Sequence, residues 1–282
     1  MEPVSQSLQN TVIREKLSFD LPLPADYEQY KVDSFKEATG DLDKEDGYNC
    51  QNCKNKGLIM RLSEENGEKH QVAYDCKCMP IRKSILRMKR SGLKDVIHDC
   101  TFDKWIATED WQKTMKNAAV EYAKDPKGWF FIGGQSGCGK THLCSAICRE
   151  FLLNGKEVQY MQWREESKKL KGAPKDTGQH TSLIDGFKQA EVLYIDDLFK
   201  CGKNPDGSEQ KPTSADIGIA FEIINYRYNK PASLTIISSE LSSSDLIDID
   251  EATGSRICER SKVLIIAKDK ARNYRLKNEI TL

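Results

Sequence analysis

One stretch of the chain has the residue types and spacing of a phosphate-binding loop. It reads Gly134-Gln135-Ser136-Gly137-Cys138-Gly139-Lys140-Thr141 and fits the pattern G-x-x-x-x-G-K-[ST]. Glycine lets successive backbone N–H groups approach the α- and β-phosphates of a nucleotide, Lys140 is placed to reach the β- and γ-oxygens, and the Thr141 hydroxyl is suited to Mg²⁺. We interpret Cys138 as a loop position that tolerates any side chain rather than as a redox group.

A pair of acids follows an apolar run, Val192 to Ile195, further along the chain. Asp196, at the end of the expected strand, is predicted to hold Mg²⁺, and Asp197 is predicted to lie next to the attacking water. The simpler interpretation is that the two acids only cap the next turn. Aspartate is one methylene shorter than the glutamate common at the second position, so slow hydrolysis is expected.

Three further groups could act on a γ-phosphate. Ser239 follows the apolar run Leu234 to Ile237, where a hydroxyl could sense the phosphate or orient water. Arg256 and Arg260 are spaced i, i+4 on one helix face, which suits a phosphate across a subunit interface because a guanidinium stabilises charge spread over phosphoryl oxygens. Ordinary salt bridging to nearby glutamates is the alternative for this pair. Arg275, near the C-terminus, is a third candidate arginine.

Four of the ten cysteines have metal-ligand spacing. Cys50 and Cys53 precede, and Cys76 and Cys78 follow, two short apolar runs that are joined by Asn66-Gly67, a strong β-hairpin signal. A hairpin would bring both pairs together around one tetrahedral Zn²⁺. Free thiols, or His70 in place of one cysteine, remain alternatives.

The elements that position these residues alternate between strands and helices. Apolar runs at 129–132, 158–161, 192–195 and 234–237 are expected strands, and helices are expected from Lys140 and around 217–228. This alternation predicts an α/β fold with a parallel sheet and helices on both faces. We expect an N-terminal arm, helical or partly disordered, over 1–47, a zinc-binding hairpin and basic linker helix over 48–92, and an ATPase domain over 93–282.

Charge and hydropathy limit the possible partners. The 282-residue chain has 43 Lys and Arg and 43 Asp and Glu, so nucleic acid could bind only through local basic patches. We expect single-stranded DNA at Lys168, Lys169 and Lys171, with Tyr160 and Trp163 nearby, although these lysines could be a solvated helix face. The chain shows neither a run near the roughly 20 apolar residues of a membrane helix nor a secretion signal, so a cytoplasmic location is expected.

The ordered set of motifs resembles the DnaC/DnaI-type AAA+ replicative helicase loaders, particularly the phage and Firmicutes versions with a zinc-bearing N-terminal domain. The set comprises the four-cysteine hairpin, CTFDKW, GGQSGCGKTH, VLYIDDLF, INYRYNKPASLTIISSEL, GSRICER and NYRLK, over roughly 48–278. The resemblance implies an AAA+ core without a C-terminal lid, in which Lys140, Thr141, Asp196 and Asp197 form the ATP site.

The same resemblance implies the remaining roles. Ser239 or Glu240 would occupy the sensor position, where relatives commonly have Asn, Arg260 or Arg256 would act on a neighbouring subunit, and Arg275 would be the second sensor. The implied partners are a hexameric replicative DNA helicase, single-stranded DNA and further copies of the chain. A related transposition helper ATPase, or an adaptor that binds nucleotide as a switch, are the competing interpretations.

Overall fold

The computed structural model describes residues 26–65, 67–90, 99–173, 178–202, 205–208 and 210–276. Three expectations therefore lie outside the described residues: the first 25 residues of the arm, Asn66 in the hairpin turn, and the boundary expected near Gly92. Among the described residues, no helix is both long enough and apolar enough to cross a bilayer.

A five-stranded sheet forms the larger part of the molecule, with strand order β4-β5-β6-β3-β7 and parallel pairing throughout. The strands are β3 (Trp129–Gly134), β4 (Val158–Gln162), β5 (Val192–Asp196), β6 (Leu234–Ser238) and β7 (Ser261–Ile266). Every residue of β3, β5 and β6 is buried, as expected for parallel strands covered on both faces. The expected parallel sheet is confirmed, and β7 is an addition to the four expected strands.

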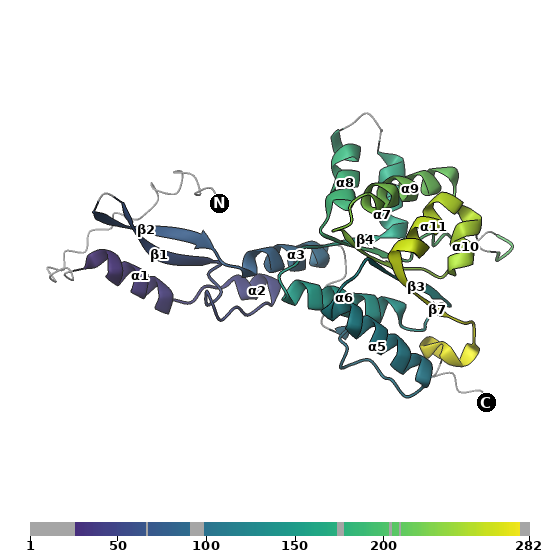
Figure 1. Cartoon of the computed structure of the whole chain (residues 1–282), viewed down its shortest axis with the longest axis horizontal. Coiled ribbons are helices and arrows are strands. Elements are labelled where there is room, and N and C mark those ends of the chain that lie inside the picture. Colours follow the sequence, from purple (N-terminus) through teal and green to yellow (C-terminus); the bar gives the residue numbers. More distant parts are fainter. Residues whose placement is uncertain are drawn as a thin grey trace.

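Helices cover both faces of this sheet (Figure 1). Because alternate side chains of a strand point to opposite faces, Phe130 and Ile132 join one apolar cluster while Trp129 and Phe131 join the other. The first cluster includes residues of α3 (Cys78–Arg90), α5 (Asp110–Lys124) and α6 (Lys140–Leu153). The second includes residues of α7 (Trp163–Gly172), α8 (Gly178–Gln189), α9 (Ser214–Tyr228), α10 (Ser243–Ile249) and α11 (Glu251–Arg260).

The N-terminal part projects away from the sheet, and α3 lies between the two (Figure 1). It contains α1 (Tyr27–Glu37), α2 (Leu42–Asp46) and an antiparallel hairpin of β1 (Leu58–Glu65) and β2 (Glu68–Asp75), paired from Leu58↔Asp75 to Glu65↔Glu68. The predicted hairpin is therefore confirmed. Helix α1 lies along it, and Gln71 donates a hydrogen bond of 2.8 Å to Glu28.

A buried ion pair joins the N-terminal elements. Arg82 of α3 donates from Nη1 to both carboxylate oxygens of Asp46 at 2.7 and 2.6 Å, and from Nη2 to Asn55 at 2.9 Å. Ile81, the preceding residue, belongs to the apolar cluster of the sheet. Helix α3 thus packs against both parts, while the domain division at 47 and 92 stays a prediction.

After β7, the described residues continue as two short 3₁₀-helices, η2 (Lys270–Arg272) and η3 (Tyr274–Leu276). These are the last described elements, and the absence of a C-terminal lid stays an expectation.

Candidate nucleotide and metal sites

The phosphate-binding loop joins β3 to the N-terminus of α6, the position that this motif requires. Gly139 precedes α6 with φ +90°, a left-handed conformation that glycine adopts without strain. A Cβ atom there would lie 2.5 Å from the ring of Trp105. Glycine is therefore required both by the backbone and by the packing of the CTFDKW segment.

Lys140 and Cys138 are buried within the loop. Lys140 Nζ donates to the carbonyl oxygens of Gly134 and Gln135 at 2.8 and 2.7 Å, so its charge stays beside the loop. Burial raises the pKa of the Cys138 thiol. This is opposite to the lowered pKa of a reactive cysteine, and it agrees with the interpretation of Cys138 as a passive position.

Asp196 is buried at the end of β5 and accepts hydrogen bonds from four hydroxyl groups. Thr141 Oγ1 lies 3.2 Å, Tyr194 Oη 2.7 Å and Tyr160 Oη 3.0 Å from its carboxylate oxygens, and the Ser238 hydroxyl is the fourth donor. The phosphate loop and β5 thus place a hydroxyl and a carboxylate together. Oxygen ligands of this kind suit Mg²⁺.

A polar cavity of about 240 Å³ lies beside the loop. Of the sequence candidates, it brings together Ser136, Gly137, Gly139, Lys140, Thr141, Asp197, Glu240 and Arg275, and it also contacts His142 and Lys200, which the sequence analysis did not single out. Arg256, Arg260 and Ser239 do not line this cavity.

Ser239 points away from the cavity. Its hydroxyl is fully buried and donates to the carbonyl oxygen of Leu198 at 2.8 Å. The hydroxyl that reaches the site is instead that of Ser238, bonded to Asp196. At the expected sensor position, the side chain that faces the cavity is Glu240.

Lys200 lies between two carboxylates at the cavity. Its Nζ is 2.8 Å from Asp197 Oδ2 and 2.9 Å from Glu240 Oε1. Burial opposes the charged form of Lys200, but the two carboxylates outweigh it and raise the lysine pKa. Burial likewise opposes ionisation of Glu240, but Lys200 lowers the pKa of Glu240 overall. Lys200 and Glu240 thus each favour the charged form of the other.

The C-terminal segment closes over the phosphate loop. Gln135 and Asp269 exchange two hydrogen bonds of 2.7 and 2.6 Å, and the backbone N–H of Tyr274 donates to the Gly137 carbonyl at 2.9 Å. These contacts carry Arg275 to the cavity, where its Nη1 lies 3.3 Å from Ser136 Oγ.

Arg256 and Arg260 lie on α11 away from the cavity of their own chain. Their guanidinium groups lie 5.4 and 5.7 Å from the ring centre of Tyr228. In the described part of the chain, Nε and Nη2 of Arg260 have no hydrogen-bond partner, and neither arginine forms an ion pair with an acid. The salt-bridge alternative is therefore wrong for the described residues, since Glu259 accepts from Tyr228 instead.

The four cysteines of the hairpin meet in one buried cluster in which all ligand atoms lie within 4.8 Å of one another. The Cys50–Cys76 and Cys53–Cys78 sulfur pairs are 3.9 and 3.6 Å apart. Tetrahedral zinc with bonds of about 2.3 Å places its sulfurs about 3.8 Å apart, so the spacing fits zinc. Backbone N–H of Gly57 donates to Cys53 Sγ at 3.3 Å, a contact typical around a bound thiolate.

The alternative ligand His70 lies away from this cluster. It pairs with Ser63 in the middle of the hairpin, and the group of possible metal ligands contains only cysteines.

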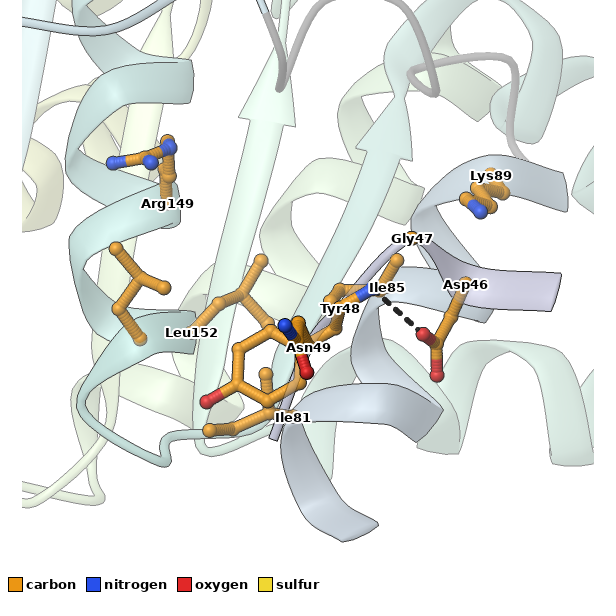
Figure 2. Close-up of a pocket in the computed structure, with 10 residues that line it drawn as sticks. Asp46, Gly47, Tyr48, Asn49, Ile81, Ile85, Lys89, Arg149 and Leu152 are labelled. Atoms are coloured by element: carbon orange, nitrogen blue, oxygen red, sulfur yellow. Dashed lines mark hydrogen bonds between the residues drawn. The ribbon is translucent and has the colours of Figure 1, made fainter. Parts of the chain in front are cut away.

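A second cavity, of about 160 Å³, lies where the N-terminal elements meet α6. Figure 2 shows Ile81, Ile85 and Lys89 of α3 and Arg149 and Leu152 of α6 among the residues that line it. It lies apart from the phosphate cavity, since no residue lines both.

The residues of the DNA-binding patch expected around Lys168 contact other residues of the chain. Trp163 is buried against Phe199, and the Tyr160 hydroxyl donates to Asp196, so neither ring is free to stack on a base. The three lysines are paired with acids: Lys168 with Glu165, Lys169 with Glu166 and Lys171 with Asp216. The two rings are therefore occupied by contacts within the chain, while DNA binding at these lysines stays a prediction.

Comparisons with known proteins agree with this geometry. Residues 62–280 match the family described as IstB-like ATP binding protein. Protein XkdC of the phage-like element PBSX in Bacillus subtilis (strain 168) is 33% identical over 245 residues, which cover 81% of this chain and 86% of that protein. The replicative helicase loader DnaC of Escherichia coli (strain K12) is 24% identical over 204 residues, 70% of this chain and 78% of that protein.

Among solved structures, the crystal structure of the DnaC helicase loader superposes with a TM-score of 0.51 and 22% identity, over 60% of this chain and 98% of that chain. The likeness confirms the expected fold, a parallel sheet with flanking helices.

Proposed function

Because this chain belongs to the family of IstB-like ATP-binding proteins, we propose that it is an AAA+ ATPase that loads a hexameric replicative DNA helicase onto single-stranded DNA. The observation that carries the proposal is the phosphate cavity, in which Lys140, Thr141 and Asp197 converge beside Asp196. The match to relatives named as replicative helicase loaders supports the choice of helicase loading over other uses of ATP.

In the proposed mechanism, the loop N–H groups and Lys140 bind the phosphates of ATP. Lys140 exchanges its two carbonyl acceptors for phosphate oxygens. Thr141 and Asp196 would hold Mg²⁺, whose charge offsets that of the phosphate oxygens when it is bound. Asp197 orients the attacking water, and its role as catalytic carboxylate requires that it release Lys200.

Two arginine positions complete the proposed site. Arg275 reaches the phosphates from the C-terminal segment of the same chain, beside Ser136. Arg260 is the better candidate for contact with the nucleotide of a neighbouring subunit, because its guanidinium has two buried nitrogens without a partner in the described structure. Arg256 already donates to the Ala252 carbonyl at 2.6 Å.

The four hairpin cysteines would hold one structural Zn²⁺, and we propose that this N-terminal part contacts the helicase, in the cytoplasm. Its projection from the ATPase core leaves it accessible to a large partner (Figure 1).

A loading assay tests the proposal. The full chain is mixed with the replicative helicase of its host, ATP and circular single-stranded DNA, and helicase bound to the circle is measured after gel filtration. We expect loading by the wild type and none by Lys140→Ala. If the helicase is not bound while double-stranded DNA stimulates turnover, the transposition helper is favoured. Nucleotide binding without turnover favours the adaptor.

A further inference from the structure

Lys200 lines the phosphate cavity outside every motif used above. The cavity is lined by three basic side chains, Lys140, Lys200 and Arg275, by two acidic ones, Asp197 and Glu240, and by the imidazole of His142. Of the three basic groups, Lys200 is the one that forms ion pairs with both carboxylates. Positive charge in a cleft attracts a polyanion, and Lys200 contributes to that charge.

The backbone before Lys200 adopts an uncommon conformation. Asp197 and Phe199 both have positive φ, 57° and 61°, although neither is glycine. Such conformations cost free energy and persist only where the surrounding structure enforces them, and they cluster at functional sites. Here the turn closes through a hydrogen bond of 2.9 Å from the Lys200 N–H to the Asp197 carbonyl, and it directs the Lys200 side chain back toward the cavity.

The Lys200 ion pairs are not needed to hold the turn after β5 against the end of β6. Strands β5 and β6 are already paired, and three hydrogen bonds continue beyond them: Leu198 N–H to Ser238 O, Asp197 N–H to Ser238 Oγ, and Ser239 Oγ to Leu198 O. The turn after β5 is thus attached to the end of β6 without Lys200. Meanwhile Asp197, the proposed catalytic carboxylate, is occupied by the lysine.

We propose that Lys200 is a phosphate-contacting residue that distinguishes nucleoside triphosphate from diphosphate. Glu240 is the positioning residue, which holds Lys200 through its ion pair until a triphosphate binds. This inference rests on the proposed function, since it assumes that the cavity binds ATP. Lys140 and Arg275 contact the phosphate loop itself, through Gln135 and Ser136, whereas Lys200 lies at the ends of β5 and β6 beside Asp197. A terminal phosphate beside Asp197 would attract Lys200, and Asp197 would be released to orient water.

The test measures binding of a non-hydrolysable ATP analogue and of ADP to the full chain by titration calorimetry. For Lys200→Ala we expect a loss of about 10- to 100-fold in affinity for the analogue, as for one charge-assisted hydrogen bond, and little change for ADP. Lys200→Arg should retain most of the preference. Lys211→Ala is the matched control, because Lys211 lines only a neighbouring cavity.

A second experiment uses the variant Glu240→Gln. Removing the competing carboxylate should tighten analogue binding, and the gain should disappear in the double variant with Lys200→Ala. A gain that persists without Lys200 would show that Glu240 acts only through its own charge, and would overturn the proposal.

Two further outcomes separate this inference from the proposed function. If wild type prefers the triphosphate and Lys200→Ala keeps that preference, or loses both nucleotides equally, the role of Lys200 is wrong while the ATPase stands. If wild type binds neither nucleotide, both are wrong. Retained ADP binding shows that a variant is folded.

Discussion

Two neighbouring aspartates have different surroundings, and this difference predicts different roles. Asp196 is buried and accepts from four hydroxyls, so its carboxylate is held in one position. The Asp197 side chain is 29% exposed, and its carboxylate forms an ion pair with one lysine, Lys200. The fixed carboxylate suits metal binding, and the releasable one suits water activation.

At the residue scale we therefore predict that Lys140→Ala and Asp197→Asn fail at different steps. Lys140→Ala should lose ATP binding, because the phosphates lose their main charge partner. Asp197→Asn should bind ATP but hydrolyse it about 10²- to 10⁴-fold more slowly, the usual loss when a general base is removed. Equilibrium binding and single-turnover hydrolysis measure the two steps. Asp248→Asn, outside the phosphate cavity, is the control; loss of binding in both test variants would contradict this division.

The sequence indicates some residues of the site better than others for a physical reason. The phosphate loop and Asp196 are each recognised from residues next to a single strand, so the sequence predicts them directly. The Lys200–Glu240 pair joins two loops 40 positions apart, and no local pattern shows it. Ser239 was favoured over Ser238, but the alternation of β6 turns Ser238 toward Asp196 and Ser239 toward Leu198.

At the scale of elements, the cysteine cluster depends on one hairpin. The full pairing of β1 with β2 brings Cys76 and Cys78 back to the pair before β1, and the buried Arg82–Asp46 pair fixes α3 and α2 beside it. Cysteine spacing and the turn signal were enough to predict this arrangement. The Arg82–Asp46 pair was not predictable, because its two residues lie 36 positions apart in different elements.

We predict that zinc removal unfolds the hairpin but leaves nucleotide binding intact. Metal binding supplies folding free energy to so small a module, whereas the phosphate cavity is lined only by residues from Ser136 onward. Cys53→Ser should lose zinc by metal analysis and become sensitive to proteolysis between residues 48 and 78, with unchanged ATP affinity. Cys258→Ser, outside the cluster, should keep one zinc per chain. A zinc-free wild type with a protease-resistant hairpin would refute the structural role.

At the scale of the whole molecule, we propose that a neighbouring chain completes the site. The phosphate cavity and the α11 arginines lie apart, and Arg260 presents a guanidinium stacked on Tyr228 with nitrogens that no described group satisfies. An unpaired guanidinium attracts anions, so we expect a partner that supplies one. The net charge of zero could not predict this need for an anion, because the need depends on where the charged side chains lie in the structure.

The last prediction is that two inactive variants restore hydrolysis when mixed. Lys140→Ala lacks a working phosphate cavity but keeps Arg260, and Arg260→Ala keeps the cavity but lacks the arginine. Each alone should hydrolyse ATP at background rates, although Arg260→Ala should still bind it. In a mixed assembly, an intact cavity of one variant meets the intact arginine of the other. Steady-state turnover should therefore rise with total protein concentration, and at a fixed total concentration it should be highest when the two variants are present in near equal proportions.

Mixing Lys140→Ala with Asp197→Asn is the control, because both lesions lie in the cavity and no interface is complete. If the first mixture stays as inactive as the control, or if Arg260→Ala alone is fully active, Arg260 does not act on a neighbouring subunit.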